Sequence, residues 1–268
     1  MKKYRVLVTI IIAMGIILIG QSNPINNFYK SAGLISKGVN QGEEVKKDNK
    51  EKDNNDVKEK KYLICIDPGH QSKGDPNPES VAPGSSQKKA RVSSGATGVS
   101  TKKPEYVLNL EASIVLKHIL EGKGYEVIMT RETHDVNISN AERATLANEK
   151  NADMVVRIHA DSLDNSSKTG ASILIPGKNS KYTSSIYEES SKCAELIKTS
   201  MKSNAIELNG IFERDDLTGF NWSKVPVVLV EMGFLSNYNE DQMMSNPEYQ
   251  RKLMQTIADG VEEYFKTK

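Results

Sequence analysis

The sequence predicts a single α/β domain over residues 61–268, with a mostly parallel, twisted sheet of about six strands and helices on both faces. Two observations predict it. Short runs of β-branched and apolar residues alternate with longer segments whose apolar residues recur at helical spacing. Several short runs, such as 225–230, are apolar throughout, which is typical of strands covered on both faces of a parallel sheet.

The expected elements follow one another along the chain. Strands are expected at 62–66, 125–129, 154–158, 171–175 and 225–230, and helices at 104–121, 139–150, 184–203 and 247–265. The first helix has Pro104 in its first turn and Gly122 after its end, and the second opens on the capping-box sequence that begins at Ser139. The Pro-, Gly- and Ser-rich segment 71–103 is too long for a simple connection, so we expect it to frame a site.

The first sixty residues are expected to direct and tether the domain. Lys2, Lys3 and Arg5 precede an apolar run over 6–19, so residues 1–20 are predicted to be a signal peptide or an N-terminal membrane anchor. As a helix this run spans about 21 Å, against a hydrocarbon core of ~30 Å, which leaves both alternatives open. Residues 21–60 are polar and low in complexity, which indicates a flexible linker. The domain is therefore expected to be exported, either membrane-anchored or secreted.

Composition narrows the function further. Lys and Arg number 36 and Asp and Glu number 35, so the charge balance gives no reason to expect a nucleic-acid partner. Cys65 and Cys193 are the only cysteines, which excludes a disulfide framework and a cysteine-rich zinc site. We expect both to be small buried hydrophobic residues.

Three ionisable residues come directly after predicted strands. His70 follows the first strand through Asp67-Pro68-Gly69, His159 follows the third, and Glu231 follows the strand that ends at Val230. Ligands of open α/β sheets bind outside the carboxyl ends of the strands. If these strands are parallel neighbours, the three side chains converge.

Helix geometry adds a fourth residue. Glu105 falls about 40° from the centre of the apolar stripe of helix 104–121, so its carboxylate faces the sheet, where it needs a partner such as a cation. Two histidines and a carboxylate are the ligand set of a catalytic zinc, and a further carboxylate can act as general base. Each residue alone has a structural explanation, such as a loop position or a helix N-terminal acid. Their convergence is what predicts a metal site.

Five motifs in this order resemble those of the zinc-dependent N-acetylmuramoyl-L-alanine amidases of the LytC, CwlD and AmiC type, the amidase_3 family. The motifs are Ile66–His70, Pro104–Leu110, Met129–Arg131, Ile158–Asp161 and Val225–Asn237. The resemblance covers residues 62–266 and includes the CwlD-like members. It implies a phosphorylase/hydrolase-like fold.

The resemblance also implies an activity and a site. His70, Glu105 and His159 would bind Zn²⁺, and Glu231 would be the catalytic acid and base. The reaction would be hydrolysis of the amide bond between the lactyl group of N-acetylmuramic acid and the L-alanine of the stem peptide in peptidoglycan. The expected setting is the cell wall or the spore cortex, and an accessory protein partner is expected to assist.

The sequence departs from the family pattern at two places. Gln71 and Ser72 stand where the family has glycines, which leaves the shape of the substrate site open. Arg157 replaces a small residue and is either a contact to substrate or an anion, or a strand arginine paired with an acid. Asn221, Trp222 and Asn237 are further candidates for substrate contact, with an anchoring role for the aromatic Trp222 as the alternative.

Two other functions fit the same residues at this stage. One is another zinc-dependent wall peptidase, such as a carboxypeptidase, which the cleavage products would distinguish. The other is a non-catalytic wall-binding or regulatory protein on the same fold. Glu231 favours an enzyme, because a degenerate member would be expected to lack it.

Overall fold

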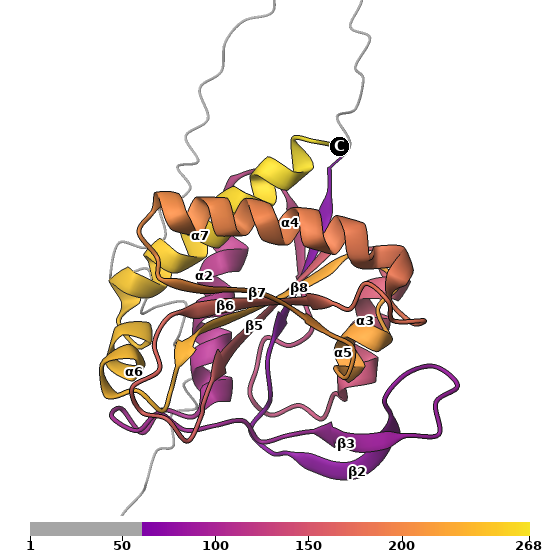
Figure 1. Cartoon of the computed structure of the whole chain (residues 1–268), viewed down its shortest axis with the longest axis horizontal. Helices are drawn as coiled ribbons and strands as arrows, with labels where there is room; N and C mark the ends of the chain where they lie inside the picture. The colour runs from indigo at the N-terminus through magenta and orange to yellow at the C-terminus, as the bar shows by residue number, and fades with distance from the viewer. Residues whose placement is uncertain (1–60) are drawn as a thin grey trace, which may run out of the picture. The chain divides into compact units, whose positions relative to one another are not determined.

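A computed structural model of the chain describes residues 61–268, so the expectations for residues 1–20 and 21–60 lie outside the described part. Its centre is a six-stranded sheet of order β4-β1-β5-β8-β6-β7 (Figure 1). In that order the strands are Glu126–Met129, Leu63–Pro68, Met154–Asp161, Val227–Phe234, Ala171–Pro176 and Leu208–Arg214. Within residues 61–268, no helix is long and apolar enough to cross a membrane.

The sheet is mostly parallel, which confirms the predicted fold class. β4, β1, β5 and β8 run in one direction, and β6 pairs antiparallel with β8 and parallel with β7. The strand β7 was not predicted. Its sequence has a glycine, two charged residues and little burial, as expected for an edge strand with a weak apolar pattern.

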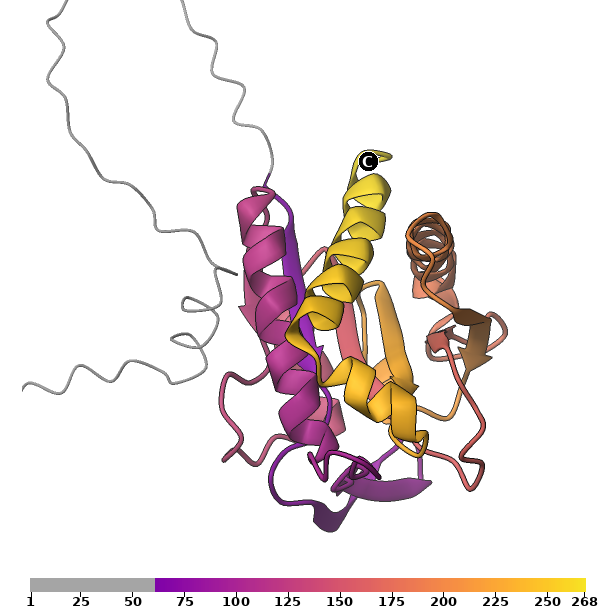
Figure 2. The same cartoon turned by 90° about the vertical axis from the view of Figure 1, so that its left-hand side faces the viewer.

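Three helices cover one face of the sheet. α2 (Glu105–Gly122), α7 (Pro247–Phe265) and α4 (Ser184–Ser203) lie side by side, with α7 between the other two (Figure 2). α4 and α7 approach closely at Gly260, where an added Cβ would lie 2.5 Å from the Cα atom of Ile197. A side chain at this position would therefore push the two helices apart.

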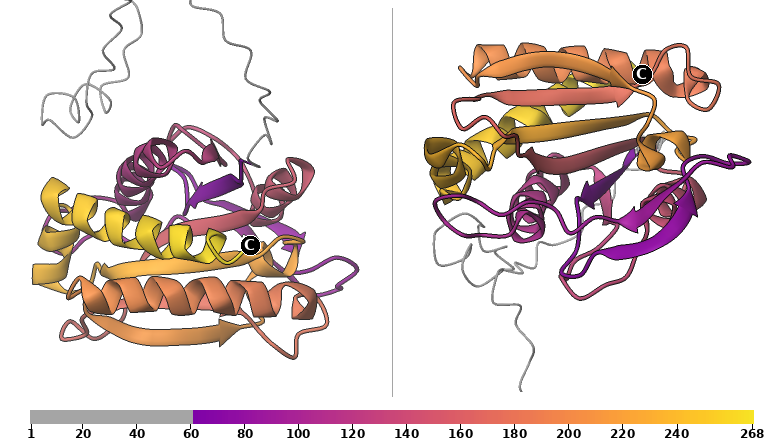
Figure 3. Two further views of the ribbon diagram at one scale, coloured as in Figure 1. Left: turned by 90° about the horizontal axis from the view of Figure 1, so that it is seen from above. Right: turned by 60° about the horizontal axis from the view of Figure 1, so that its bottom comes forward.

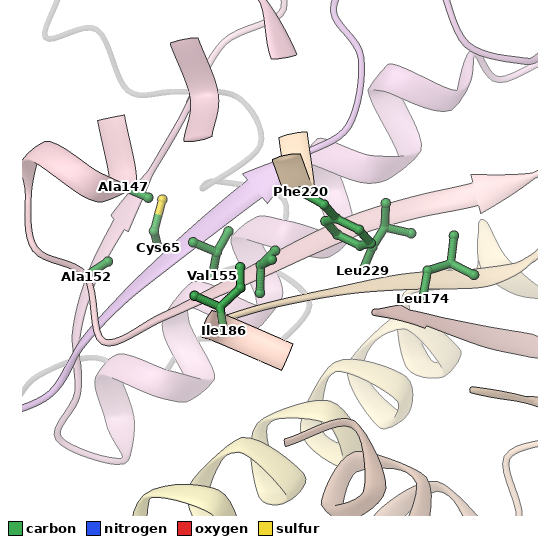
Figure 4. Close-up of a cluster of buried hydrophobic side chains, with 9 residues drawn as sticks. Cys65, Ala147, Ala152, Val155, Leu174, Ile186, Phe220 and Leu229 are labelled. Carbon is green, nitrogen blue, oxygen red and sulfur yellow. The ribbon is translucent and has the colours of Figure 1, made fainter. Parts of the chain in front are cut away.

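The other face is covered by α3 (Asn140–Glu149) and the short helix α5 (Thr218–Asn221) (Figures 1 and 3). Ser139 forms the predicted capping box with Glu142 at the start of α3. Phe220 of α5 is fully buried among side chains of four strands and α3, and this cluster includes Cys65 (Figure 4). Cys65 and Cys193 are both buried and free, as predicted.

The segment 71–103 contains an antiparallel hairpin of β2 (Asp75–Ser80) and β3 (Lys88–Val92). These two strands are not predicted from the sequence, because Pro76 and Pro78 lack the N–H groups that a paired strand uses for its hydrogen bonds. A further short helix, α6 (Tyr238–Met244), lies between β8 and α7 in the chain.

A buried carboxylate ties the end of β1 to its surroundings. Asp67 is 1% exposed, and its two oxygens lie 2.8 Å from Arg143 Nη1 and 2.8 Å from Arg157 Nε. Thr130 donates a further hydrogen bond to it. Burial alone would raise the pKa of Asp67, but the charges of Arg143 and Arg157 and the Thr130 hydrogen bond outweigh it and hold the pKa well below its usual value of 3.8.

This depressed pKa predicts acid-sensitive stability. The ionised Asp67 stabilises the fold above its unfolded pKa of about 3.9, and this contribution is lost as the pH falls towards the lower folded value. We expect Asp67→Asn to lower the free energy of unfolding by about 3–5 kcal/mol at neutral pH. The free energy of unfolding of the variant should also decrease less than that of wild type as the pH is lowered. Urea unfolding at a series of pH values measures both effects. The exposed-acid control Glu188→Gln should change stability by less than about 1 kcal/mol. Equal acid dependence in Asp67→Asn and wild type would contradict this account.

Candidate active site

Three strand ends converge, as expected from the sequence. β1, β5 and β8 are parallel neighbours, and His159 of β5 lies in register with Glu231 of β8. His70 follows β1 after Gly69, whose backbone N–H donates to the carbonyl of Ile158 at 2.9 Å. The backbone hydrogen bond therefore holds the His70 turn against the strand that carries His159.

Glu105 joins the two histidines from the first turn of α2. It is 4% exposed, and its Oε1 atom lies 3.0 Å from His70 Nε2 and 3.3 Å from His159 Nδ1. One ligand-type atom of each of the three residues lies within 4.8 Å of the others. The side chains of His70 and His159 remain 15% and 13% exposed, so the group is open to a ligand from solvent.

Backbone donors and one amide fix the Glu105 carboxylate. Oε2 accepts from Ala96 N at 2.9 Å, and Oε1 accepts from Asn109 Nδ2 at 3.1 Å and from Ala160 N at 3.3 Å. Burial by itself would raise the pKa of Glu105, but its contacts with His159 and His70 hold the pKa well below its usual range. The residue is therefore an ionised carboxylate.

The ring of His70 has a defined orientation. Its Nδ1 lies 3.0 Å from the carbonyl oxygen of Ser93, and because a carbonyl oxygen only accepts, Nδ1 carries the proton. The lone pair of Nε2 then faces the Glu105 carboxylate, an arrangement that a shared cation stabilises. His70 has a φ of +60°, which a residue other than glycine adopts at a cost in strain.

Two buried atoms at the site have no hydrogen-bond partner among residues 61–268. They are His159 Nε2 and Glu231 Oε2. Burial lowers the pKa of His159 to about 4, and the hydrogen bond with Glu105 opposes this shift only in part. Burial also raises the pKa of Glu231 well above its usual range, together with the charges of Glu105 and Asp161. The site thus combines neutral imidazole nitrogen, the hydrogen-bonded carboxylate of Glu105 and an unpartnered carboxyl oxygen of Glu231.

Two glycines leave room for this grouping. A Cβ atom on Gly69 would collide with the imidazole ring of His159. Gly95 has a φ of +79°, and a Cβ there would lie 2.9 Å from Glu105 Oε2 and 3.0 Å from His70 Cγ. The cradle, the unpartnered atoms and the nitrogen and oxygen donors all fit a metal ion, so the group of His70, Glu105 and His159 is consistent with a metal site.

The segment 71–103 frames this site as expected, since Ser93 and Ala96 bind His70 and Glu105 from it. The supporting residues Ser93 and Asn109 were not singled out from sequence. Asn109 was within reach of the helix argument, because it lies one turn beyond Glu105 on the same helix face. Nothing in the sequence pattern marks Ser93, whose role depends on how the loop folds.

Arg157 is held by protein groups. It is 5% exposed, pairs with Asp67 and lies 3.3 Å from Asn140 Oδ1 through Nη2. Gly219 packs so tightly on its guanidinium that a Cβ would collide with it. Asp67 is therefore the acid required by the interpretation of Arg157 as a strand arginine paired with an acid.

The other three candidates for substrate contact also use their polar groups within the fold. Asn221 is 3% exposed and donates to the carbonyl of Asp215 at 2.9 Å. The Trp222 indole donates to the carbonyl of Ser80 at 2.9 Å and so anchors β2. Asn237 is 8% exposed and caps the N-terminus of α6. These bonds give each of the three side chains a structural role, and a part for them in substrate contact stays a prediction.

The arrangement fits a metal-dependent α/β hydrolase, with three candidate ligands at the carboxyl edge of parallel strands and a second carboxylate beside them. Comparison with known proteins narrows this class. Residues 64–263 match the family Amidase_3, described as N-acetylmuramoyl-L-alanine amidase, and the chain belongs to that family.

Individual relatives agree with the family. The germination-specific N-acetylmuramoyl-L-alanine amidase of Bacillus subtilis is 28% identical over 226 residues, which cover 77% of this chain and 81% of that protein. The crystal structure of the amidase Ami1 from Mycobacterium smegmatis superposes with a TM-score of 0.70 at 22% identity, over 77% of this chain and 98% of that one. The CwlD amidase of Clostridioides difficile, solved in complex with the GerS lipoprotein, gives 0.61 at 24% identity, over 77% and 100%. At these identities the two structures show the fold alone.

The family confirms the function that the motifs implied. The protein is an N-acetylmuramoyl-L-alanine amidase that hydrolyses peptidoglycan, and its action is extracytoplasmic. The alternatives of a wall carboxypeptidase and a non-catalytic protein are not supported by the family match.

The glycine cradle gives a test of the metal site. Gly95→Ala should lower metal affinity at least about tenfold, because the new methyl group displaces Glu105 or His70, and it should also cost about 1–2 kcal/mol of stability from the positive φ. Gly84→Ala is a matched control, since Gly84 has a φ of +73° with nothing within 4 Å of an added Cβ. Zinc titration and thermal unfolding measure the two effects. Equal metal affinity in both variants would contradict the proposed packing.

Proposed function

We propose that His70, Glu105 and His159 bind one zinc ion and that Glu231 is the general base and acid of amide hydrolysis. The bond cleaved is that between the lactyl group of N-acetylmuramic acid and the first residue, L-alanine, of the stem peptide. The observation that carries this proposal is the group of three ligand-type atoms within 4.8 Å, on strand ends that also present Glu231.

The donor set supports zinc in particular. Two imidazoles and one carboxylate are a donor set found in catalytic zinc sites, and three protein ligands leave a place open for a reactant. When bound, zinc supplies Lewis-acid chemistry that polarises a carbonyl group and lowers the pKa of water. Ser93, Ala96 and Asn109 hold the ligand side chains in place for it.

Glu231 has the properties of the proton carrier. Its Oε2 atom is buried without a partner among the described residues, so it is free to accept a proton from the attacking water. The carboxyl group then donates this proton to the leaving nitrogen of L-alanine. Its position opposite His159 in the sheet keeps it beside the ligands without being one of them.

Glu231→Gln tests this role. We expect the variant to retain zinc and wild-type stability but to lose roughly 10²–10⁴-fold in the rate of peptidoglycan hydrolysis, because the amide cannot take up a proton. The exposed-residue variant Glu195→Gln should keep full activity. Mass spectrometry of wild-type digests should show new N-terminal L-alanine on intact stem peptides. Release of a terminal residue instead, or full activity of Glu231→Gln, would count against the proposal.

We also propose that residues 1–20 export the domain as a cleaved signal peptide or a retained anchor, and that residues 21–60 link this segment to the domain. The support is the basic and apolar pattern of the N-terminus, together with the extracytoplasmic action of the family. Residues 1–60 fused to a phosphatase active only outside the cytoplasm should give phosphatase activity. Removal of residues 1–20 is the control, and equal activity of both fusions would refute export by this segment.

The proposal extends to where the enzyme acts and to a partner protein. We propose that it acts in the vegetative cell wall or in the spore cortex. The cortex is included because the Bacillus subtilis relative is germination-specific by name. An accessory protein is proposed because the Clostridioides difficile CwlD structure is a complex with a lipoprotein. Comparing digestion of vegetative and cortex peptidoglycan by the purified protein, with and without extract of the producing cells, distinguishes these settings.

A further inference from the structure

The turn that carries His70 is surrounded by buried arginine side chains. Resting on the zinc site proposed above, we propose that Arg131 and Arg143 are positioning residues that hold the turn 68–70, called here the histidine turn, in the strained conformation that directs His70 to the metal. Each of the three carbonyl groups of the histidine turn accepts a hydrogen bond from one or both of these arginines.

Arg131 links the histidine turn to the helix that carries Glu105. Its Nε donates to Pro68 O at 3.0 Å and its Nη2 to Gly69 O at 2.8 Å. The same Nη2 donates to Tyr106 O at 2.9 Å, in the first turn of α2. One rigid guanidinium thus fixes the distance between the backbone segments of two metal ligands.

Arg143 holds the histidine turn from the side of α3. Its Nη1 donates to Pro68 O at 2.8 Å and its Nη2 to His70 O at 3.0 Å. Nη1 is also paired with Asp67, directly before the turn, at 2.8 Å. The carbonyl of His70 itself is therefore bound by a charged donor.

The conformation of the turn explains why it needs such donors. His70 has a φ of +60°, which is unfavourable for a side chain with a Cβ atom, and it persists only where the surroundings enforce it. The carbonyls point into a region where Arg131 and Arg143 are 3% and 2% exposed, so water does not satisfy them. Charge-assisted hydrogen bonds to all three carbonyls offset the strain.

The charge balance indicates that Arg131 is retained for these carbonyls. Three buried arginines, at positions 131, 143 and 157, surround the single carboxylate of Asp67, and Asp67 pairs with the latter two. Within residues 61–268 Arg131 has no ion pair, and its donors go to backbone carbonyls. Burial and the charge of Arg143 lower its pKa to about 10, so it remains a cation at neutral pH. Burying a cation without its own counter-ion costs free energy, and hydrogen bonds to the carbonyl groups offset that cost.

Conservative substitutions test the inference, because lysine keeps the charge but replaces the planar fork of several guanidinium nitrogens by a single nitrogen at the end of a flexible chain. We expect Arg131→Lys and Arg143→Lys in the full chain to weaken zinc binding by about 10- to 100-fold, measured by competition with a chelator. The absorption spectrum of the cobalt-loaded variants should change, since the ligand geometry changes. Thermal unfolding of the same samples reports stability separately.

Arg157→Lys is the matched control. Arg157 belongs to the same buried cluster and pairs with Asp67, but it donates to none of the three carbonyls of the histidine turn. We expect this variant to lose stability while keeping the zinc affinity and cobalt spectrum of wild type. Zinc affinity unchanged in Arg131→Lys and Arg143→Lys, or weakened equally in Arg157→Lys, would overturn the inference.

Two further outcomes are also decisive. If the lysine variants do not fold, Arg131→Gln, which keeps one amide donor, takes their place with the same expected loss of zinc affinity. Failure of all three to fold while Arg157→Lys folds would show that the arginines are structural and would overturn the positioning role. Failure of wild type to bind zinc would instead refute the proposed metal site, so the two ideas fail in different ways.

Discussion

The parallel pairing of β1, β5 and β8 is the constraint from which the site follows. Because the carboxyl ends of the three strands lie at the same edge of the sheet, the residues at or just beyond these ends meet without any long excursion of the chain. The helix that returns from β1 towards β4 begins at the same edge, and its first residue is Glu105. Two histidines and two glutamates far apart in sequence are thus brought together by topology, and the loops need only adjust their orientation.

The fine orientation depends on polar contacts beneath the site. The histidine turn is held by guanidinium groups and by the N–H of Gly69, and the Glu105 carboxylate by two backbone N–H groups and Asn109. Such bonds are directional, so they fix angles that apolar packing leaves freer. Burial of the apolar cores on the two faces of the sheet stabilises the fold and offsets the free-energy cost of burying this polar cluster.

The sequence was sufficient for the elements with strong local patterns and for the residues whose position follows from them. The helices 184–203 and 247–265 have the predicted bounds, and Glu105 lies on the buried helix face as its spacing indicated. The hairpin β2–β3 and the edge strand β7 could not be predicted from the sequence, because these strands are defined by the partners they pair with rather than by a periodic apolar pattern. Arg157 shows the same limit, since a strand face can be read from sequence but the acid across the sheet cannot.

The departure from the family pattern after His70 affects the surroundings of the site rather than the ligands. Gln71, in place of glycine, is 1% exposed and accepts from Ile138 N and Arg143, so it fastens the loop after β4 beside the histidine turn. Gln71 also lines a cavity of about 440 Å³ between this loop and the segment around Asp75. Because Gln71 joins the histidine turn to this cavity, we expect any difference in substrate preference from other family members to arise there.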